Sequence, residues 1–461
     1  MDSSHSINYF PNGFLDSLHK APGFSLDNFI QSHLRPAAVS VRVNPYKPSD
    51  KFSSFEKVPW SKTGYYLPVR PDFIFDPLLH SGSYYVQEAS SMFLETVLSS
   101  LNDLPENPFV LDACAAPGGK STIISSFLKG KGLLVSNEVV QQRAHILSEN
   151  IQKWYSLNAA VTSVDPSRFS RLPGFFDVIL ADVPCSGSGL FRKDISSMQE
   201  WSLDNVLHCA ARQRRISGEL LQALKPGGYF IYSTCSFSVD ENESMLDWLI
   251  KSFDLESVVV PLQPEWGICH SVSGEAKANG YRFYPDKVRG EGFFIGVLRK
   301  KNNPVSEARR KKKVNGFSLI KEPEIRQYGF VNPDSAVGAI SWRDEIILLP
   351  SATKDDFFFL MDNLPVLHVG CKVGKVVSGA LIPHHSLAMS PEICIHKSVV
   401  DLDLNSALRY LRRDEMKITI EQQGWNLVRF EGHNLGWIKV IGHRINNYYP
   451  KEFRILKALP A

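Results

Sequence analysis

The chain has 461 residues, of which 43% are hydrophobic and 21% charged, and its formal net charge is +3. These values are typical of a soluble globular protein with about three domains, and they exclude a disordered or fibrous chain. No apolar run approaches the length of a membrane span, and the residues after Met1 lack the pattern of a secretory signal. We therefore expect a cytoplasmic protein with no membrane partner.

The first predicted region covers residues 1–80. Its pattern is mixed, and turn signals interrupt it at Asn12-Gly13, Pro22-Gly23 and Asn44-Pro45. We expect an α+β segment in front of the more regular part of the chain.

The second predicted region covers residues 81–300, where short apolar runs alternate with longer amphipathic stretches. Buried strands are expected at 110–111, 132–135, 177–181 and 229–232, and helices at 120–128, 140–156 and 204–224. This alternation predicts an α/β domain with a mostly parallel, doubly wound sheet. Ligands of such sheets bind beyond the carboxyl ends of the strands, and the motifs described below fall there.

A basic segment, residues 301–320, follows and is predicted to be a linker. Its charges are either simply solvated or in contact with RNA phosphates. Beyond it, residues 321–461 carry short β-rich runs and many turn residues, which predict small α+β or barrel-like modules.

The seven cysteines are scattered along the chain and form no CxxC pair, which argues against a disulfide framework and against a thiolate zinc site. They stand at positions 114, 185, 209, 235, 269, 371 and 394. The nearest approach to a metal cluster is His384, His385, Cys394 and His396, and ordinary loop histidines are the commoner explanation of such a grouping. We therefore expect no metal.

The first chemical motif is a glycine-rich turn between a strand and a helix, residues 112–121. Small residues there let a ligand approach the backbone, and the helix begins with exposed amide groups. A phosphate-binding P-loop would need glycine at the position of Cys114, so that match fails. Glu138 and Asp165 each follow a later strand, and in this order they favour a nucleoside cofactor, although each acid alone could be merely solvated.

Two further motifs place a cysteine at a strand end, in residues 182–187 and 233–236. An isolated cysteine is more often a small buried hydrophobe, as we expect for Cys209 and Cys371. For Cys185 and Cys235 the flanking Pro, Ser, Thr and Gly residues favour chemistry instead. A pair of such thiols suggests a covalent reaction with separate attack and release steps.

Together these motifs resemble those of the RNA cytosine-5 methyltransferases of the NOL1/NOP2/Sun family. The resemblance covers residues 25–300 and includes residues 42–45, 87–91 and 290–294. It implies a Rossmann-like methyltransferase domain that uses S-adenosyl-L-methionine, preceded by an N-terminal RNA-binding segment. The absence of a dinucleotide phosphate-binding spacing agrees with this cofactor rather than with NAD.

The family mechanism, carried over position by position, implies a role for each site residue. Cys235 is the implied nucleophile that adds to C6 of cytosine, Asp182 meets the ring near N3, and Cys185 assists proton removal at C5 and product release. The implied cofactor contacts are Cys114, Ala115, Ala116, Pro117, Gly118, Gly119, Lys120, Glu138, Asp165 and Asp182. Cys114 is expected to be structural or to line this pocket.

Three further positions, Lys193, Val183 and Asp286, lie near these motifs. Lys193 is a candidate for an active-site or phosphate contact, or a solvated lysine. Val183 stands where the family usually has alanine, and Asp286 stands where a histidine is common, which puts the RNA contact there in doubt.

The C-terminal region indicates the subgroup. Residues 374–377, 383–388, 435–439 and 446–450 resemble the tail of bacterial RsmF-type enzymes, which methylate small-subunit ribosomal RNA and end in PUA-like RNA-binding modules. Exposed aromatic residues such as Trp437, near Lys439, would either stack on bases or fill a small core.

We therefore expect a monomer that methylates cytosine C5 in small-subunit (16S) ribosomal RNA, either as naked RNA or in the small subunit. Two alternatives are a transfer RNA substrate and a non-catalytic RNA-binding factor of ribosome assembly, and a DNA substrate is not excluded by the sequence.

Overall fold

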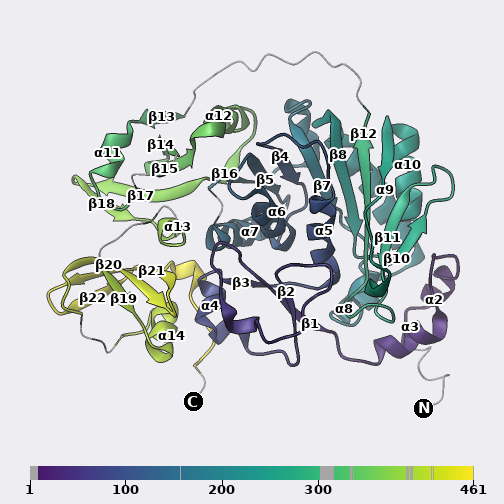
Figure 1. Cartoon of the computed structure of the whole chain (residues 1–461), viewed down its shortest axis with the longest axis horizontal. Coiled ribbons are helices and arrows are strands. Elements are labelled where there is room, and N and C mark those ends of the chain that lie inside the picture. Colours follow the sequence, from purple (N-terminus) through teal and green to yellow (C-terminus); the bar gives the residue numbers. More distant parts are fainter. Residues whose placement is uncertain are drawn as a thin grey trace.

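The computed structural model describes residues 9–155, 157–301, 316–332, 335, 337–390, 394, 398–416, 418 and 420–459. A central sheet flanked by helices lies beside the C-terminal sheets and above the small N-terminal sheet in Figure 1. In the described ranges, no helix combines the length and the apolar character needed to cross a membrane. The basic run 308–313 of the expected linker lies outside the described residues.

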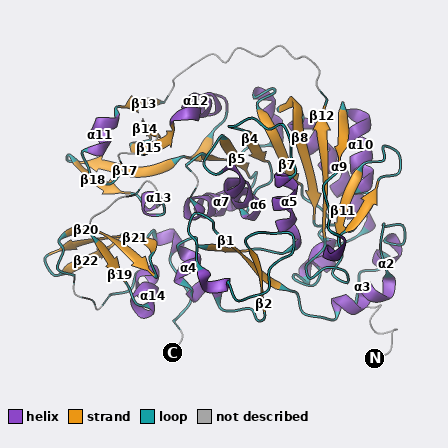
Figure 2. Cartoon of the chain, in the orientation of Figure 1, coloured by secondary structure: helices purple, strands orange, loops and turns teal. Residues whose placement is uncertain are grey.

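The largest sheet of the described residues has ten strands (Figure 2). Its parallel middle consists of β4 (Phe109–Asp112), β5 (Leu133–Asn137), β6 (Ala159–Thr162), β7 (Phe176–Asp182) and β8 (Leu224–Thr234). Its antiparallel edges consist of β9 (Leu255–Val258), β10 (Cys269–Val272), β11 (Asn279–Phe283), β12 (Phe293–Lys300) and β16 (Val366–Val369). The order is β10-β11-β12-β8-β7-β4-β5-β6-β16, and β9 pairs with β12.

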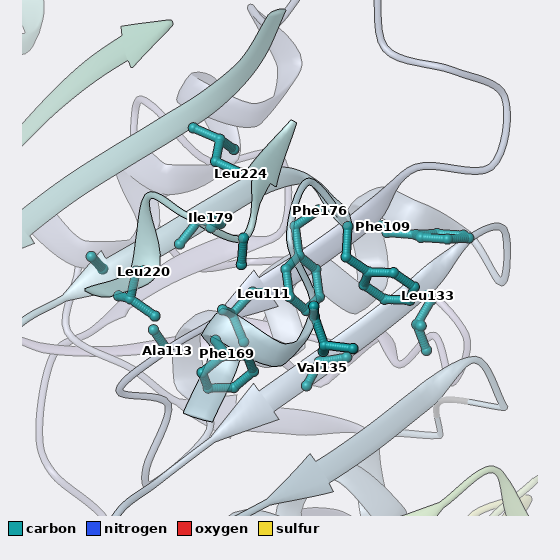
Figure 3. Close-up of a cluster of buried hydrophobic side chains, with 14 of the residues drawn as sticks. Phe109, Leu111, Ala113, Leu133, Val135, Phe169, Phe176, Ile179, Leu220 and Leu224 are labelled. Carbon is teal, nitrogen blue, oxygen red and sulfur yellow. The ribbon is translucent and has the colours of Figure 1, made fainter. Parts of the chain in front are cut away.

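Helices cover both faces of this sheet because its strands bury side chains on both faces. Along β4, Val110 belongs to one hydrophobic cluster and Leu111 to the other, as the two-residue period of a strand requires. One face packs against α5 (Leu94–Ser99), α6 (Gly119–Leu128) and α7 (Gln141–Trp154), and the other against α9 (Leu203–Leu220) and α10 (Glu243–Ser252). Figure 3 shows the second cluster, to which Leu111, Leu133, Ile179 and Leu220 belong. The connections contain α8 (Ser196–Glu200), η4 (Pro166–Arg171), η5 (Ser188–Leu190) and η6 (Pro264–Trp266).

The predicted α/β fold is confirmed. The expected strands coincide with β4, β5, β7 and β8, and the expected helices coincide with α6, α7 and α9. The antiparallel edges were not predicted.

The N-terminal region contains a three-stranded sheet of order β2-β1-β3. Its elements are α2 (Phe14–Ser17), α3 (Leu26–His33), β1 (Val39–Val43), η1 (Asp50–Phe52), β2 (Gly64–Leu67), η2 (Phe73–Phe75), α4 (Pro77–His80), β3 (Tyr84–Val86) and η3 (Ser90–Phe93). β3 lies beyond the boundary expected at residue 80, because it completes this sheet by pairing with β1. Asn44 fixes the region to α7 by donating to the carbonyls of Gly82 and Trp154 at 2.8 and 2.7 Å.

The described chain beyond residue 316 forms two sheets of its own. The first contains β13 (Phe317–Ile320), β14 (Val337–Trp342), β15 (Glu345–Pro350), β17 (Cys371–Val377) and β18 (Ala380–Pro383), with α11 (Glu322–Arg326), η7 (Ser351–Thr353), α12 (Lys354–Asn363) and α13 (His385–Ala388). β13 falls inside the segment expected to be a linker. The chain that forms this first sheet also contributes a strand to the central sheet, because β16 pairs with β6.

The last sheet has the order β19-β20-β21-β22. Its elements are β19 (Val399–Asp401), α14 (Leu404–Arg412), β20 (Gly424–Phe430), β21 (His433–Ile441), β22 (Arg444–Asn447) and η8 (Lys451–Phe453). This sheet packs on the N-terminal region, since Val41, Phe52 and Tyr84 share a hydrophobic cluster with Leu408 and Val428.

Trp437 does not provide an exposed stacking surface. Its exposed fraction is 0%, its ring packs edge-on against Phe330 at 5.5 Å, and its indole N–H donates to the His384 carbonyl at 3.0 Å. The core alternative is therefore correct for this residue, because contacts from distant segments cover it.

A buried histidine, His80, lies at the junction between the N-terminal region and the last sheet. The Nε2 of His80 lies 2.8 Å from the Ile74 carbonyl, and its Nδ1 lies 3.4 Å from the Tyr449 hydroxyl of the last sheet. Burial, assisted by the charge of Lys153, lowers the pKa of His80 to about 4. Between pH 6.5 and 4 the unfolded chain therefore binds a proton at His80 that the folded chain does not bind.

We expect the free energy of unfolding to fall as the pH falls from 6.5 to 5. The contribution of His80 is on the order of 2 kcal/mol, since one pKa unit corresponds to about 1.4 kcal/mol. Urea unfolding of the wild type and of His80→Gln at both pH values measures it, because the other titrating groups are common to both proteins. An equal loss in the two proteins would contradict the assignment to His80.

Candidate active site

Two thiols meet at the carboxyl edge of the parallel strands. Cys185 follows β7 and Cys235 follows β8, and their sulfur atoms lie 2.9 Å apart. Both cysteines are half-buried and free. Hydrogen bonds between the strand ends support this approach, because the Val183 N–H donates to the Ser233 carbonyl at 3.0 Å and the Gly189 N–H to the Cys235 carbonyl at 2.7 Å.

The two thiols differ in their surroundings. The hydrogen bond to Cys235 and burial, followed by the charges of Cys235 and Glu241, raise the pKa of Cys185 well above its usual value. A thiolate is the nucleophilic form of cysteine, so the raised pKa makes Cys185 the poorer candidate for attack.

Asp182, the last residue of β7, forms an ion pair beside the thiols. Its Oδ2 accepts a hydrogen bond from Lys120 Nζ at 2.8 Å, and its Oδ1 accepts one from the Ser233 hydroxyl at 2.7 Å. Burial disfavours the charge of Lys120, but the attraction of Asp182 outweighs burial and raises the pKa of Lys120. The side chain of Asp182 is still 26% exposed, so a ligand can reach this charged pair.

The glycine-rich turn is stabilised by side chains of a neighbouring helix, α7. Gly118 has φ +117°, a conformation that favours glycine, and the Ala116–Pro117 peptide bond is cis. Side chains of α7 bind the carbonyls of the turn, with Arg143 donating to Ala116 at 2.9 Å and Asn150 to Pro117 at 2.8 Å. The helix α6 then begins at Gly119.

The N-terminal motifs support the same turn. Arg42 is buried, stacks on Trp154 at 4.4 Å, and donates to Gln87 Oε1 at 2.8 Å. The guanidinium also bonds the Thr122 hydroxyl of α6. Residues 42–45 and 87–91 therefore link the N-terminal region to the turn.

Acidic side chains surround the turn, and two of them are buried. Glu138 is only 4% exposed, accepts the Val140 N–H at 2.9 Å and pairs with Arg143 at 3.4 Å. Asp112 accepts a hydrogen bond from Ser121 at 2.7 Å, and burial raises the pKa of Asp112 to about 7. Among the described residues, Asp112 Oδ1 is buried without a hydrogen-bond partner.

The residues present fit S-adenosyl-L-methionine. Its sulfonium and ammonium charges would offset the carboxylates of Asp112 and Asp182, and its ribose hydroxyls suit the carboxylate of Glu138. Burial and the charges of the surrounding acids raise the pKa of Cys114, so this cysteine lies beside the acids as a neutral thiol.

Asp165 differs from the other predicted acids. Its side chain is 44% exposed, accepts the Ser167 N–H at 3.0 Å and pairs with Arg215 at 3.2 Å. It follows β6, and its contact with a cofactor stays a prediction.

The remaining predicted positions are less informative. Lys193 is exposed, whereas Arg192 beside it forms a buried ion pair with Glu291 at 2.8 Å. Val183 is buried, and Asp286 is half-buried. No group of three His, Cys, Asp or Glu side chains suited to a metal exists among the described residues, which do not include His396.

Sequence reasoning missed Ser233, which fixes Asp182, and Glu241, which contacts the residues after both thiols. The sequence feature that could have drawn attention to Glu241 is the acidic run 240–243, which follows the Cys235 motif closely.

The fold and the site define the class of this protein as an S-adenosyl-L-methionine-dependent methyltransferase. The chain is 31% identical to the ribosomal RNA small subunit methyltransferase F of Aeromonas salmonicida, over 97% of this chain and 98% of that protein. The protein of the same name from Klebsiella pneumoniae is 31% identical over 96% of each chain. The chain belongs to the RsmF family of RNA methyltransferases.

Family models describe all three regions. Residues 99–299 match the 16S rRNA methyltransferase RsmB/F model, residues 10–89 match the N-terminal domain of RsmF, and residues 397–455 match the RsmF PUA domain. A methyltransferase homologue from Pyrococcus horikoshii, 28% identical, superposes with a TM-score of 0.55 over 65% of this chain and all of that one. NSun6 from the same organism, solved with SFG, an S-adenosylmethionine analogue, has the same fold with a TM-score of 0.54 at 20% identity, over 64% of this chain and 100% of that one.

Proposed function

We propose that this protein methylates C5 of cytosine in small-subunit ribosomal RNA through a covalent adduct with Cys235. The observation that carries the proposal is the pair of sulfur atoms 2.9 Å apart beside the Asp182–Lys120 ion pair. The names of the full-length relatives support small-subunit ribosomal RNA as the substrate, and the matching family models support its 16S RNA.

Attack by Cys235 begins the reaction. Cytosine C5 is too weak a nucleophile to accept a methyl group unaided, so the Cys235 thiolate first adds to C6. The electrons of the C5–C6 double bond then become available at C5, and negative charge develops toward N3 and O2. The positive charge of Lys120, which pairs with Asp182 at 2.8 Å, can offset this negative charge. A proton that passes from Lys120 to N3 through Asp182 would let the Asp182 carboxylate accept a hydrogen bond from the ring.

S-adenosyl-L-methionine supplies the electrophilic methyl group that C5 takes up. The C5 proton must then leave so that the C5–C6 double bond can form again and the Cys235 thiolate can depart. Cys185 is placed for this task because its sulfur is adjacent to that of Cys235. Its raised pKa depends first on Cys235, so formation of the bond to C6 lowers the pKa of Cys185 when a base is needed.

The rest of the chain serves RNA binding in this proposal. The target base must leave its stack to reach Cys235, which costs a few kcal/mol that contacts elsewhere must offset. The N-terminal and PUA regions flank the methyltransferase domain and are proposed to supply these contacts. We propose that the protein acts as a monomer in the cytoplasm.

Methylation of separate RNA substrates tests the function. The protein is incubated with labelled S-adenosyl-L-methionine and naked 16S ribosomal RNA, small ribosomal subunits or transfer RNA, and the labelled RNA is digested to nucleosides. We expect 5-methylcytosine in one of the ribosomal substrates and none in transfer RNA. Label confined to transfer RNA would establish the alternative substrate, and failure to bind the cofactor in a calorimetric titration would favour a non-catalytic factor.

Replacement of Glu138 should weaken cofactor binding without unfolding the protein. We expect Glu138→Ala to raise the Kd for S-adenosyl-L-methionine about 10- to 100-fold, since hydrogen bonds to a buried carboxylate are lost. Calorimetric titration measures this, with Glu106→Ala as a control because Glu106 forms an exposed pair with Lys131. Unchanged affinity of Glu138→Ala would contradict the role of Glu138.

A further inference from the structure

A single carboxylate joins the two loops that carry the thiols. Ser186 and Ser236 directly follow Cys185 and Cys235, and both serine hydroxyls donate a hydrogen bond to Oε2 of Glu241. The Ser186 backbone N–H also donates to Glu241 Oε1 at 2.8 Å, and the two serine oxygens lie 3.2 Å apart. The loop after β7 and the loop after β8 therefore share one acceptor.

Other side chains fix this acceptor. Glu241 is 0% exposed, and the Gln213 amide of α9 donates to its Oε1 at 3.0 Å and to the Pro184 carbonyl at 3.0 Å. The Tyr232 hydroxyl lies 2.9 Å from Gln213 Oε1 and 2.7 Å from the Glu241 carbonyl. The position of the carboxylate is thus determined by β8 and α9 as well as by the loops.

The charge of Glu241 is costly where it lies. Its hydrogen-bond partners in the described residues are hydroxyls and amides, and burial raises the pKa of Glu241 although these bonds oppose the shift. Burying a carboxylate is energetically unfavourable, and an apolar side chain in its place would often be as stable. The group therefore requires an explanation other than stability.

Covalent methylation supplies that explanation. Cys235 must reach C6 while Cys185 reaches the proton on C5, the neighbouring atom of the same ring. The two cysteines lie on loops after different strands, so their separation depends on contacts between those loops. We propose that Glu241 is a positioning residue that holds the two thiols at the separation this reaction needs. The inference rests on the two-thiol mechanism proposed above.

The separation of the thiols can be tested without RNA or cofactor. Dibromobimane is a short reagent that becomes strongly fluorescent when both of its arms have alkylated thiols. We expect the wild type to form the Cys185–Cys235 cross-link, identified by mass spectrometry and absent from Cys185→Ala. Glu241→Ala should lose most of this cross-link, and Glu241→Gln, which keeps the shape and one acceptor oxygen, should fall between the two.

Methyl transfer gives the second readout. We expect Glu241→Ala to slow single-turnover methylation about 100-fold at saturating RNA, because small misplacements of reacting groups have effects of this size. The Kd for S-adenosyl-L-methionine should stay unchanged, since Glu241 does not contact the glycine-rich turn. Ser236→Ala should act in the same direction more weakly.

Ser271→Ala is the matched control. Ser271 is also buried and donates to a buried carboxylate, Glu243 Oε1, at 2.6 Å, but it does not follow either thiol. It should keep wild-type cross-linking and methylation.

Each result decides one proposal. The positioning role would be overturned if folded Glu241→Ala cross-links like the wild type, or if Ser271→Ala loses as much of the cross-link as Glu241→Ala. If Glu241→Ala does not fold, Glu241→Gln and Ser236→Ala decide by the same criterion. A wild type that cross-links but never methylates RNA would overturn the proposed function instead, and the cross-linking series would still decide the position of the thiols.

Discussion

Replacing Cys185 and replacing Cys235 should have opposite effects on the covalent adduct. We expect Cys185→Ala to accumulate RNA bound to Cys235, because attack and methylation proceed while removal of the C5 proton is slowed. Cys235→Ala should form no adduct, and its methylation rate should fall by at least about 10⁴-fold, the scale on which loss of a nucleophile acts. Denaturing gels with labelled RNA detect the adduct, and nucleoside analysis measures methylation.

Cys209→Ala is the control for these variants. Cys209 is also a half-buried free thiol, but it lies in α9 and its sulfur contacts Asn205 at 3.7 Å rather than another cysteine. It should methylate like the wild type without trapping RNA. An adduct that forms in Cys235→Ala but not in Cys185→Ala would exchange the two roles.

The parallel half of the central sheet was predictable because its signals are local. β4, β5 and β7 are short runs buried on both faces, and amphipathic helices follow them. The carboxyl edge of the sheet follows from this order, so the motifs that contain Asp182, Cys185 and Cys235 could be placed at one site from the sequence.

The edges of the sheet depend on pairing that no local pattern records. Val366 of β16 pairs with Thr162 of β6 although the expected linker separates them in sequence. The burial of Trp437 has the same origin, because Phe330 and the segment at His384 cover it. Aromatic and basic residues close together in sequence therefore could not decide between a stacking surface and a small core.

The site also contains Glu241, a residue whose burial the local sequence does not indicate. Residues 240–243 form an acidic run that would normally be read as a solvated turn. Glu241 is buried because donors from two loops and from α9 converge on it. Such convergence is a property of the tertiary structure, whereas Cys185 and Cys235 were found because each stands in a motif of its own.

Removal of the charge of Asp182 should have the second large effect. We expect Asp182→Asn to slow single-turnover methylation about 10²- to 10³-fold, the range for loss of a group that stabilises charge in a transition state. Asparagine has the same shape as aspartate, but it lacks the charge that pairs with Lys120 at 2.8 Å. The cytosine ring is then held less firmly next to the thiols.

Asp177 provides a matched comparison on the same strand. It lies at the opposite end of β7 and also pairs with a lysine, Lys225, at 2.7 Å. Asp177→Asn removes an equivalent aspartate–lysine pair far from the carboxyl edge, so it should reduce stability while the methylation rate of the folded protein stays near that of the wild type. The two pairs differ chiefly in which end of β7 they occupy. If the methylation rate falls equally in both variants, the effect of Asp182→Asn is one of folding. If the rate falls only in Asp182→Asn, the charge of Asp182 acts at the reaction site.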